Sequence, residues 1–142
     1  MQLHPAAAIL GVTSAALLVA AGTLAVAADP SRPVTAAQVR IRHSQFAPDE
    51  LIVPAGVPVT ITIVNDDPID HEWIVGDEAL HARHRSGSEP VHDTRPTEVT
   101  LPALSTRTTT VRFAAPGEYR FVCHLPGHEG YGMTGIVRVV AG

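Results

Sequence analysis

The 142-residue chain contains no lysine, a single cysteine, and only one tryptophan, two tyrosines and three phenylalanines. Its 14 acidic residues outnumber its 10 arginines, which gives a formal net charge of −4. These shortages disfavour a nucleic-acid-binding module, which needs a basic surface and aromatic side chains on which bases stack. One cysteine also excludes an intrachain disulfide framework and a four-cysteine zinc site. The eight histidines are the abundant reactive residues, and histidine is the commonest metal ligand among side chains.

The first 28 residues carry no aspartate, glutamate, lysine or arginine. Residues 6–28 are rich in alanine and aliphatic side chains, and they reach the length of about 20 residues that spans a bilayer. Ala25-Val26-Ala27 also offers the small-x-small pattern that signal peptidases accept. We interpret residues 1–28 as a signal peptide or an uncleaved signal anchor, which would be the only contact with a membrane. Either role places the rest of the chain outside the cytoplasm, in the periplasm, outside the cell or on the outer face of its membrane, where an exposed free thiol would be reactive.

Residues 29–37 have the proline and small-residue content of a short linker, and residues 38–142 have the size of one domain. Apolar and polar residues alternate there in short runs separated by proline and glycine, which is typical of strands. The runs lie near 39–41, 57–63, 99–101, 111–113, 119–123 and 136–140. The pattern predicts an all-β domain, an antiparallel sandwich or barrel. A helix is expected only over 77–85, inside a polar insertion at 76–96.

A group of potential metal ligands lies near the end of the chain, between two expected strands. Cys123, His128 and Met133 are arranged as Cys-x4-His-x4-Met on a glycine-rich loop. A thiolate, an imidazole and a thioether suit copper, whereas calcium and magnesium prefer oxygen ligands. Zinc would accept the thiolate and the imidazole but gains little from a methionine. The loop therefore predicts a copper site.

A trigonal copper site with a weak axial methionine needs a second imidazole. His71 is the best candidate because it follows the turn 65–68 at the end of an alternating strand. Loops at one end of a sandwich converge, so His71 can meet Cys123 despite the distance in sequence. We predict one copper ion per chain, bound by His71, Cys123, His128 and Met133, although spacing alone does not decide between His71 and another histidine.

At these residues the sequence resembles the cupredoxins, the blue-copper proteins, over about residues 38–142. The intervals of five from cysteine to histidine and ten from cysteine to methionine are like those of rusticyanin and of the blue-copper centre of multicopper oxidases. Phe46-Ala47-Pro48, the segment 53–59 and Asn65 are similar to the amino-terminal half of a cupredoxin. The resemblance implies a Greek-key β-sandwich and the same four ligands. It also implies that Asn65 ties the two ligand loops together.

Copper held in this way favours electron transfer. The ligand set suits neither oxidation state of copper ideally, and the rigid sandwich keeps the ligands in nearly the same positions when the electron moves. We therefore expect an exported single-electron carrier, not an enzyme. A redox protein is expected to dock near His128, Leu125 and Tyr131, where the loop offers an apolar surface.

One alternative is a copper oxidase or nitrite-reductase-like enzyme that uses His124, adjacent to Cys123, for a second copper ion. The sequence departs from both patterns: in nitrite reductases that histidine precedes the cysteine, where Val122 stands here, and oxidases have histidines on both sides. A single domain also lacks the second half that would complete such a site.

A further alternative is copper storage or delivery, with a second metal at His81, His84, His92 or His124. On a helix His81 and His84 are neighbours, but the plainer interpretation is a polar loop whose histidines face water. Asp66 and Asp67 are interpreted as ordinary turn residues.

Overall fold

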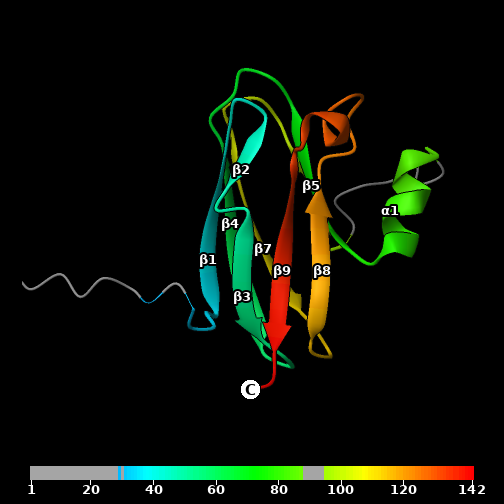
Figure 1. Ribbon diagram of the computed structural model, residues 1–142. Coiled ribbons are helices and arrows are strands. Elements are labelled where there is room, and N and C mark those ends of the chain that lie inside the picture. The colour runs from blue at the N-terminus through cyan, green and yellow to red at the C-terminus, as the bar shows by residue number, and fades with distance from the viewer. Residues whose placement is uncertain (1–28, 30, 88–94) are drawn as a thin grey trace, which may run out of the picture.

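The computed structural model describes residues 29, 31–87 and 95–142 (Figure 1). The expected leader, residues 1–28, and His92 lie outside this range. Within it the elements follow one another as β1 (Ala36–Arg42), β2 (Gln45–Ala47), β3 (Glu50–Pro54), β4 (Pro58–Asn65), β5 (His71–Gly76), α1 (Glu78–Arg85), β6 (Glu98–Leu101), β7 (Thr106–Arg112), β8 (Gly117–Val122), a short 3-10 helix η1 (Glu129–Tyr131) and β9 (Thr134–Val140). No described helix has the length and apolar character needed to cross a bilayer.

The strands form two sheets, with strand orders β2-β1-β4-β7 and β3-β9-β8-β5-β6. Buried side chains from both sheets meet in one core, which includes Ile41 and Ile61 from the first sheet and Trp73, Phe121 and Val137 from the second. The prediction of an all-β Greek-key sandwich is confirmed. The expectation of a purely antiparallel arrangement is wrong, because β1 pairs with β4 and β3 with β9 in parallel. A period of two reveals a strand but carries no information on the direction of its partner.

The alternation that predicted strands also decides which face of each strand is buried. In β4 the side chains of Val59, Ile61, Ile63 and Asn65 are buried while Pro58 and Thr60 are exposed. The short strands β2 and β3 were not predicted, because three to five residues give too brief a pattern. The expected helix is present as α1, and the Asp77 side chain caps it by accepting the Leu80 N–H at 2.8 Å.

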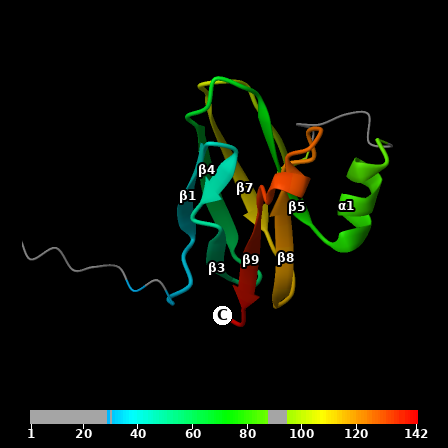
Figure 2. The ribbon, with the colours of Figure 1, turned by 45° about the horizontal axis from the view of Figure 1, so that its top comes forward.

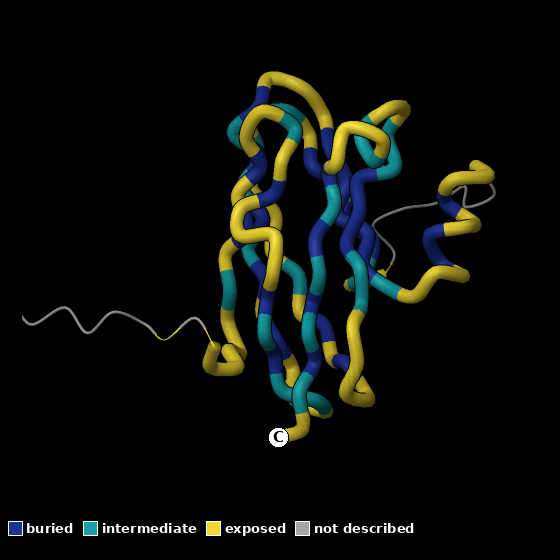
Figure 3. Tube along the Cα trace, in the orientation of Figure 1, coloured by how far each residue is buried: buried dark blue, intermediate teal, exposed yellow. Residues whose placement is uncertain are grey.

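Helix α1 lies against the outer side of the second sheet, beside β5 and β8 (Figures 1 and 2). Because α1 covers the outer face of β5, the side chains from His71 to Val75 are buried on both faces of this strand, whereas buried and exposed side chains alternate in a strand with one face open to water. Buried residues accordingly occur on α1 as well as on the strands (Figure 3). Gly76 permits the close approach, since a Cβ atom there would lie 2.4 Å from Leu80 Cδ2.

Strand directions bring three predicted ligand positions to one end of the sandwich. β8 is antiparallel to both β5 and β9, with Ile74 opposite Val122 and Val122 opposite Thr134. The start of β5, the end of β8 and the start of β9 therefore coincide, and these are the positions of His71, Cys123 and Met133.

Aromatic side chains pack in the core next to the end of the sandwich where the predicted ligands lie. The Phe121 ring packs edge-on against Phe46, with centroids 5.1 Å apart, and lies 6.0 Å from Trp73. Phe121 can cross β9 because its partner there is Gly135, where a Cβ atom would lie 2.1 Å from the Phe121 ring. The site thus rests on a packed apolar layer.

Candidate metal centre

His71 begins β5 and is fully buried. Its Nε2 lies 3.0 Å from Asp67 Oδ2. An ionised carboxylate only accepts hydrogen bonds, so Nε2 carries the proton and Nδ1 keeps its lone pair for the site. Burial lowers the pKa of His71, and this effect outweighs the hydrogen bond that His71 donates to Asp67, which raises the pKa. The imidazole is therefore held neutral and correctly oriented for a metal.

Asp67 orients His71 and is itself fixed by the chain. Its carboxylate accepts the His43 and Ser44 N–H groups at 2.8 Å each, and its own N–H donates to Asn65 Oδ1 at 3.0 Å. The interpretation of Asp67 as an ordinary turn residue is wrong. The signal available in the sequence was an acidic side chain four residues before a predicted histidine ligand, but nothing in a turn pattern separates such a residue from its neighbour Asp66.

Asn65 has a different role from the one that the family resemblance implied. Its Nδ2 donates to the carbonyl oxygens of Ile69, Leu101 and Pro102 at 2.8, 3.2 and 3.0 Å. These contacts tie the β4–β5 connection, which leads into His71, to the end of β6. Its hydrogen bonds do not reach the loop from Cys123 to Met133, so the expectation that Asn65 joins the two ligand loops is wrong in this respect.

Cys123 directly follows β8 and is also fully buried. The backbone N–H of Glu72 donates to its Sγ at 3.3 Å, a contact that stabilises a thiolate. Burial nevertheless raises the pKa of Cys123 to about 11. Without a metal the residue is therefore a protonated, inaccessible thiol, and a bound cation would displace its proton.

The loop between β8 and β9 is held by its own backbone. The Cys123 N–H donates to the Met133 carbonyl at 3.2 Å, and the Met133 N–H donates to the His128 carbonyl at 3.1 Å. Gly127 and Gly132 each adopt φ = +86°, a left-handed conformation that suits glycine. Met133 is fully buried in the core, whereas His128 is partly exposed. One ligand candidate thus reaches the surface while the others lie beneath it.

The three closest donor atoms form a triangle. Nδ1 of His71 and Nδ1 of His128 are 3.2 Å apart, and Cys123 Sγ lies 3.2 Å from the His128 nitrogen and 4.0 Å from the His71 nitrogen. A metal with bonds of about 2.0 Å to nitrogen and about 2.3 Å to sulfur, at trigonal angles, needs separations of roughly 3.5–3.8 Å. The donor set and its dimensions therefore fit a trigonal His2Cys site. Among the described residues it is the only cluster of three such donors.

Three of the histidines proposed for a second metal, His81, His84 and His124, lie together where α1 packs on the sheet. His81 Nδ1 lies 2.9 Å from His124 Nε2, and the rings of His84 and His124 stack with centroids 5.4 Å apart. The interpretation of His81 and His84 as water-facing loop residues is wrong, because both are buried by the packing of α1 on the sheet. Burial lowers the pKa of His124 to about 4. His124 does not join the triangle formed by His71, Cys123 and His128.

Comparisons with known proteins agree with this architecture. A family model described as a cupredoxin-like domain matches residues 12–135. The copper-resistant cuproprotein CopI of Rubrivivax gelatinosus is 30% identical over 98 residues, which cover 67% of this chain and 59% of CopI. The chain thus spans less than two thirds of that relative's length.

Solved structures of two auracyanins share the fold. The dithionite-reduced auracyanin of Roseiflexus castenholzii matches with a TM-score of 0.66 and 22% identity, over 77% of this chain and 99% of the auracyanin. Auracyanin A of Chloroflexus aurantiacus, described as a blue copper protein, matches with a TM-score of 0.59 and 25% identity, over 77% and 100% of the two chains.

Proposed function

Because the chain belongs to the cupredoxin family, we propose that it binds one copper ion through His71, Cys123, His128 and Met133 and carries single electrons between redox proteins. The observation that carries the proposal is the triangle of His71 Nδ1, Cys123 Sγ and His128 Nδ1 at the end of a packed sandwich. A copper ion bound there would supply one-electron chemistry by alternating between its cuprous and cupric states.

The protein's contribution is to hold the donor atoms still. Asp67 fixes the His71 ring, the Glu72 N–H fixes Cys123 Sγ, and backbone hydrogen bonds fix the loop on which His128 lies. Side chains fixed in this way move little when the charge at the site changes, which keeps the reorganisation cost of electron exchange low. Buried Met133 supplies the weak fourth ligand, and the apolar layer below disfavours the more highly charged cupric state.

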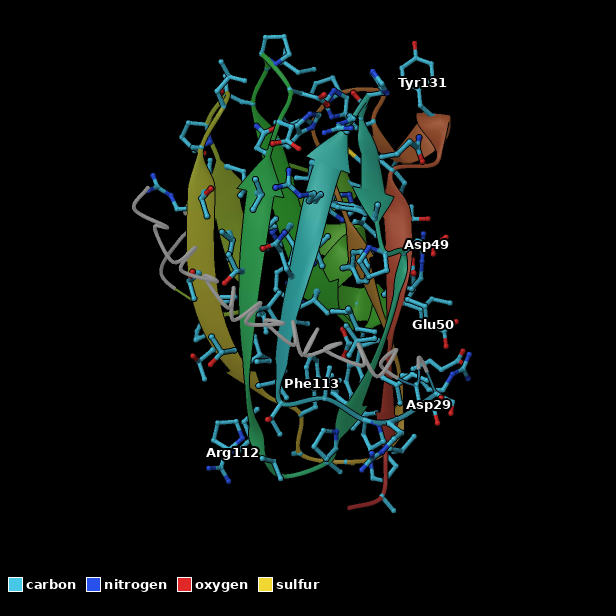
Figure 4. All side chains as sticks on the ribbon, turned by 90° about the vertical axis from the view of Figure 1, so that its left-hand side faces the viewer. Asp29, Asp49, Glu50, Arg112, Phe113 and Tyr131 are labelled. Atoms are coloured by element: carbon cyan, nitrogen blue, oxygen red, sulfur yellow. The ribbon has the colours of Figure 1, made fainter. Side chains whose placement is uncertain are left out.

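The route for electrons is through His128, the partly exposed member of the proposed ligand set. Large apolar side chains are exposed on the connections near it: Ile69 at 47%, Leu104 at 71% and Tyr131 at 78%. Figure 4 shows Tyr131 projecting from the end of the sandwich opposite Arg112 and Phe113. Leu125 packs partly into the core beneath this end. We place the docking site for a redox protein partner on this apolar surface, because such surfaces suit association.

We place the working protein outside the cytoplasm. The support is the uncharged, alanine-rich stretch before Asp29, which has the composition of an export segment. An oxidising compartment also suits a protein whose single thiol is buried and available to a metal.

The proposal is tested by a redox titration of the copper-loaded protein, which should show one reversible electron per chain and no change in fold. The docking surface is tested by Leu104→Glu, with Val57→Glu as the control because Val57 is another exposed apolar residue. The Leu104 variant should exchange electrons with a protein partner at least several-fold more slowly, while the Val57 variant keeps the rate. Equal rates for both variants would remove the docking surface from the account.

A second candidate role is copper resistance, favoured by the likeness to CopI. In this role the protein would take up excess copper instead of exchanging electrons. Rapid electron exchange by the copper-loaded protein would support the carrier, whereas slow exchange combined with a growth defect in copper after gene deletion would support resistance.

A further inference from the structure

The histidine pair under α1 is a buried polar contact that the proposed electron carrier does not use. His81 is fully buried, and the side chain of His124 is 4% exposed. They come from separate elements, since His81 lies on α1 and His124 follows Cys123 after β8. Their nitrogens Nδ1 and Nε2 are 2.9 Å apart, so one of the two must carry a proton and donate it to the other.

The proton on His81 is located by its other contact. His81 Nε2 lies 3.2 Å from the backbone carbonyl oxygen of Arg120. A carbonyl oxygen only accepts, so Nε2 carries the proton and Nδ1 presents a lone pair to His124.

His124 faces two acceptors at once. Its Nε2 meets the His81 lone pair, and its Nδ1 lies 3.5 Å from Glu129 Oε2. Glu129 is ionised and held by two 2.8 Å hydrogen bonds from Arg85. A neutral imidazole has one proton, so His124 can donate to His81 or to Glu129 but not to both. When the proton is on Nδ1, two lone pairs point at each other across 2.9 Å.

We propose that His81 Nδ1 and His124 Nε2 bind a second metal ion, cuprous copper. Each ligand then has the support that metal-binding histidines usually have, because its other nitrogen faces a backbone carbonyl or a carboxylate. A Cu(I) ion with only two ligands holds them nearly in line, so bonds of about 2.0 Å need the nitrogens about 4 Å apart. Binding therefore requires the two rings to separate by about 1 Å from their present 2.9 Å.

The oxidation state follows from the surroundings. The pair offers two neutral imidazoles in a buried place, a low coordination number that Cu(I) accepts and that Zn²⁺, which prefers four ligands, does not. The nearby side-chain charges already balance, with Glu78 and Glu129 facing Arg85 and Arg120. Burying the single positive charge of Cu(I) there costs less free energy than burying the two charges of a divalent cation. His84 stacks on the His124 ring and donates from Nδ1 to the Leu80 carbonyl, which helps to hold the His124 ring in place.

The test is an anaerobic titration of the purified metal-free protein with Cu(I) in competition with a chromophoric chelator. The unaltered protein should bind two Cu(I) per chain. His81→Gln should bind one and still develop the thiolate-to-copper absorption with Cu(II). Glutamine keeps a donor for the Arg120 carbonyl but is a poor ligand for Cu(I). Cys123→Ser should lose that absorption and still bind one Cu(I) at the histidine pair.

His43→Asn is the matched control, since His43 is an exposed histidine with φ = +54°, a conformation that asparagine tolerates. It should bind two Cu(I). If His81→Gln melts at a lower temperature than the unaltered protein, His124→Gln serves as the second variant, because it removes the other ligand of the pair and should also bind one Cu(I). A single Cu(I) in the unaltered protein, or two in both glutamine variants, would show that the pair shares only a proton and would overturn the proposal. Because the blue absorption is followed separately, such a failure leaves the site at Cys123 unaffected.

Discussion

Replacing Asp67 with alanine should weaken both the fold and copper binding, because this carboxylate accepts three hydrogen bonds at the site. It accepts the N–H groups of His43 and Ser44 and the Nε2–H of His71. His71 is fully buried, so its orphaned N–H costs about 1–3 kcal/mol, whereas water can reach the exposed His43 and the half-buried Ser44, where the loss is about 0.5–1.5 kcal/mol each. We expect the metal-free protein to lose about 2–6 kcal/mol of unfolding free energy, the sum of these contributions.

The same substitution frees the His71 ring to rotate, and loss of such an orienting partner typically lowers metal affinity by about 10–100-fold. Urea denaturation of the metal-free protein measures the first effect, and chelator competition measures the second. Asp66→Asn is the control, since the ion pairs of Asp66 within the described part of the chain are with the exposed Arg40 and Arg42. This substitution should cost less than about 1 kcal/mol of unfolding free energy and leave the metal affinity unchanged. If Asp67→Ala matched Asp66→Asn in both assays, the orienting role assigned to Asp67 would be refuted.

Two further substitutions test the packing around the site. Gly135→Ala places a methyl group against the Phe121 ring and should lower the free energy of unfolding by about 1–3 kcal/mol, as read from urea denaturation; an unchanged value would mean that the layer below the site is loosely packed. Arg85 lowers the pKa of Glu129 to about 2 from its usual 4.5. The ion pair therefore stabilises the fold above about pH 5, and this contribution is lost as the pH falls through 4.5 towards 2. Arg85→Gln should cost about 1 kcal/mol at pH 7 and almost nothing near pH 2 in urea titrations, whereas a deficit independent of pH would point to lost packing instead.

The proposed copper ligands could be predicted from the sequence because their chemistry is unusual and the spacing of three of them is short. Cys123, His128 and Met133 lie on one loop, and the direction of two antiparallel strands brings His71 to them. The role of Asp67 could not be predicted from the sequence, because aspartate is common in turns. Its partners, the backbone N–H groups of His43 and Ser44, also depend on a contact between segments that are distant in sequence.

The burial of the α1 histidines also depends on tertiary structure. The segment around His81 and His84 is polar, and its sequence alone favours exposure to water. Packing of α1 on β5 overrides that preference, because the close contact between Leu80 and Gly76 brings the helix onto the sheet. The parallel pairs β1–β4 and β3–β9 were missed for a related reason, since strand direction is decided by connections that a local pattern does not show.

The central claim is that Cys123 binds copper as a thiolate in a trigonal site. Adding Cu(II) to the metal-free protein and recording its visible absorption spectrum tests this most directly. We predict an intense blue thiolate-to-copper band at one equivalent of copper, absent in Cys123→Ser. A colourless protein, or a band that survives in Cys123→Ser, would contradict the account.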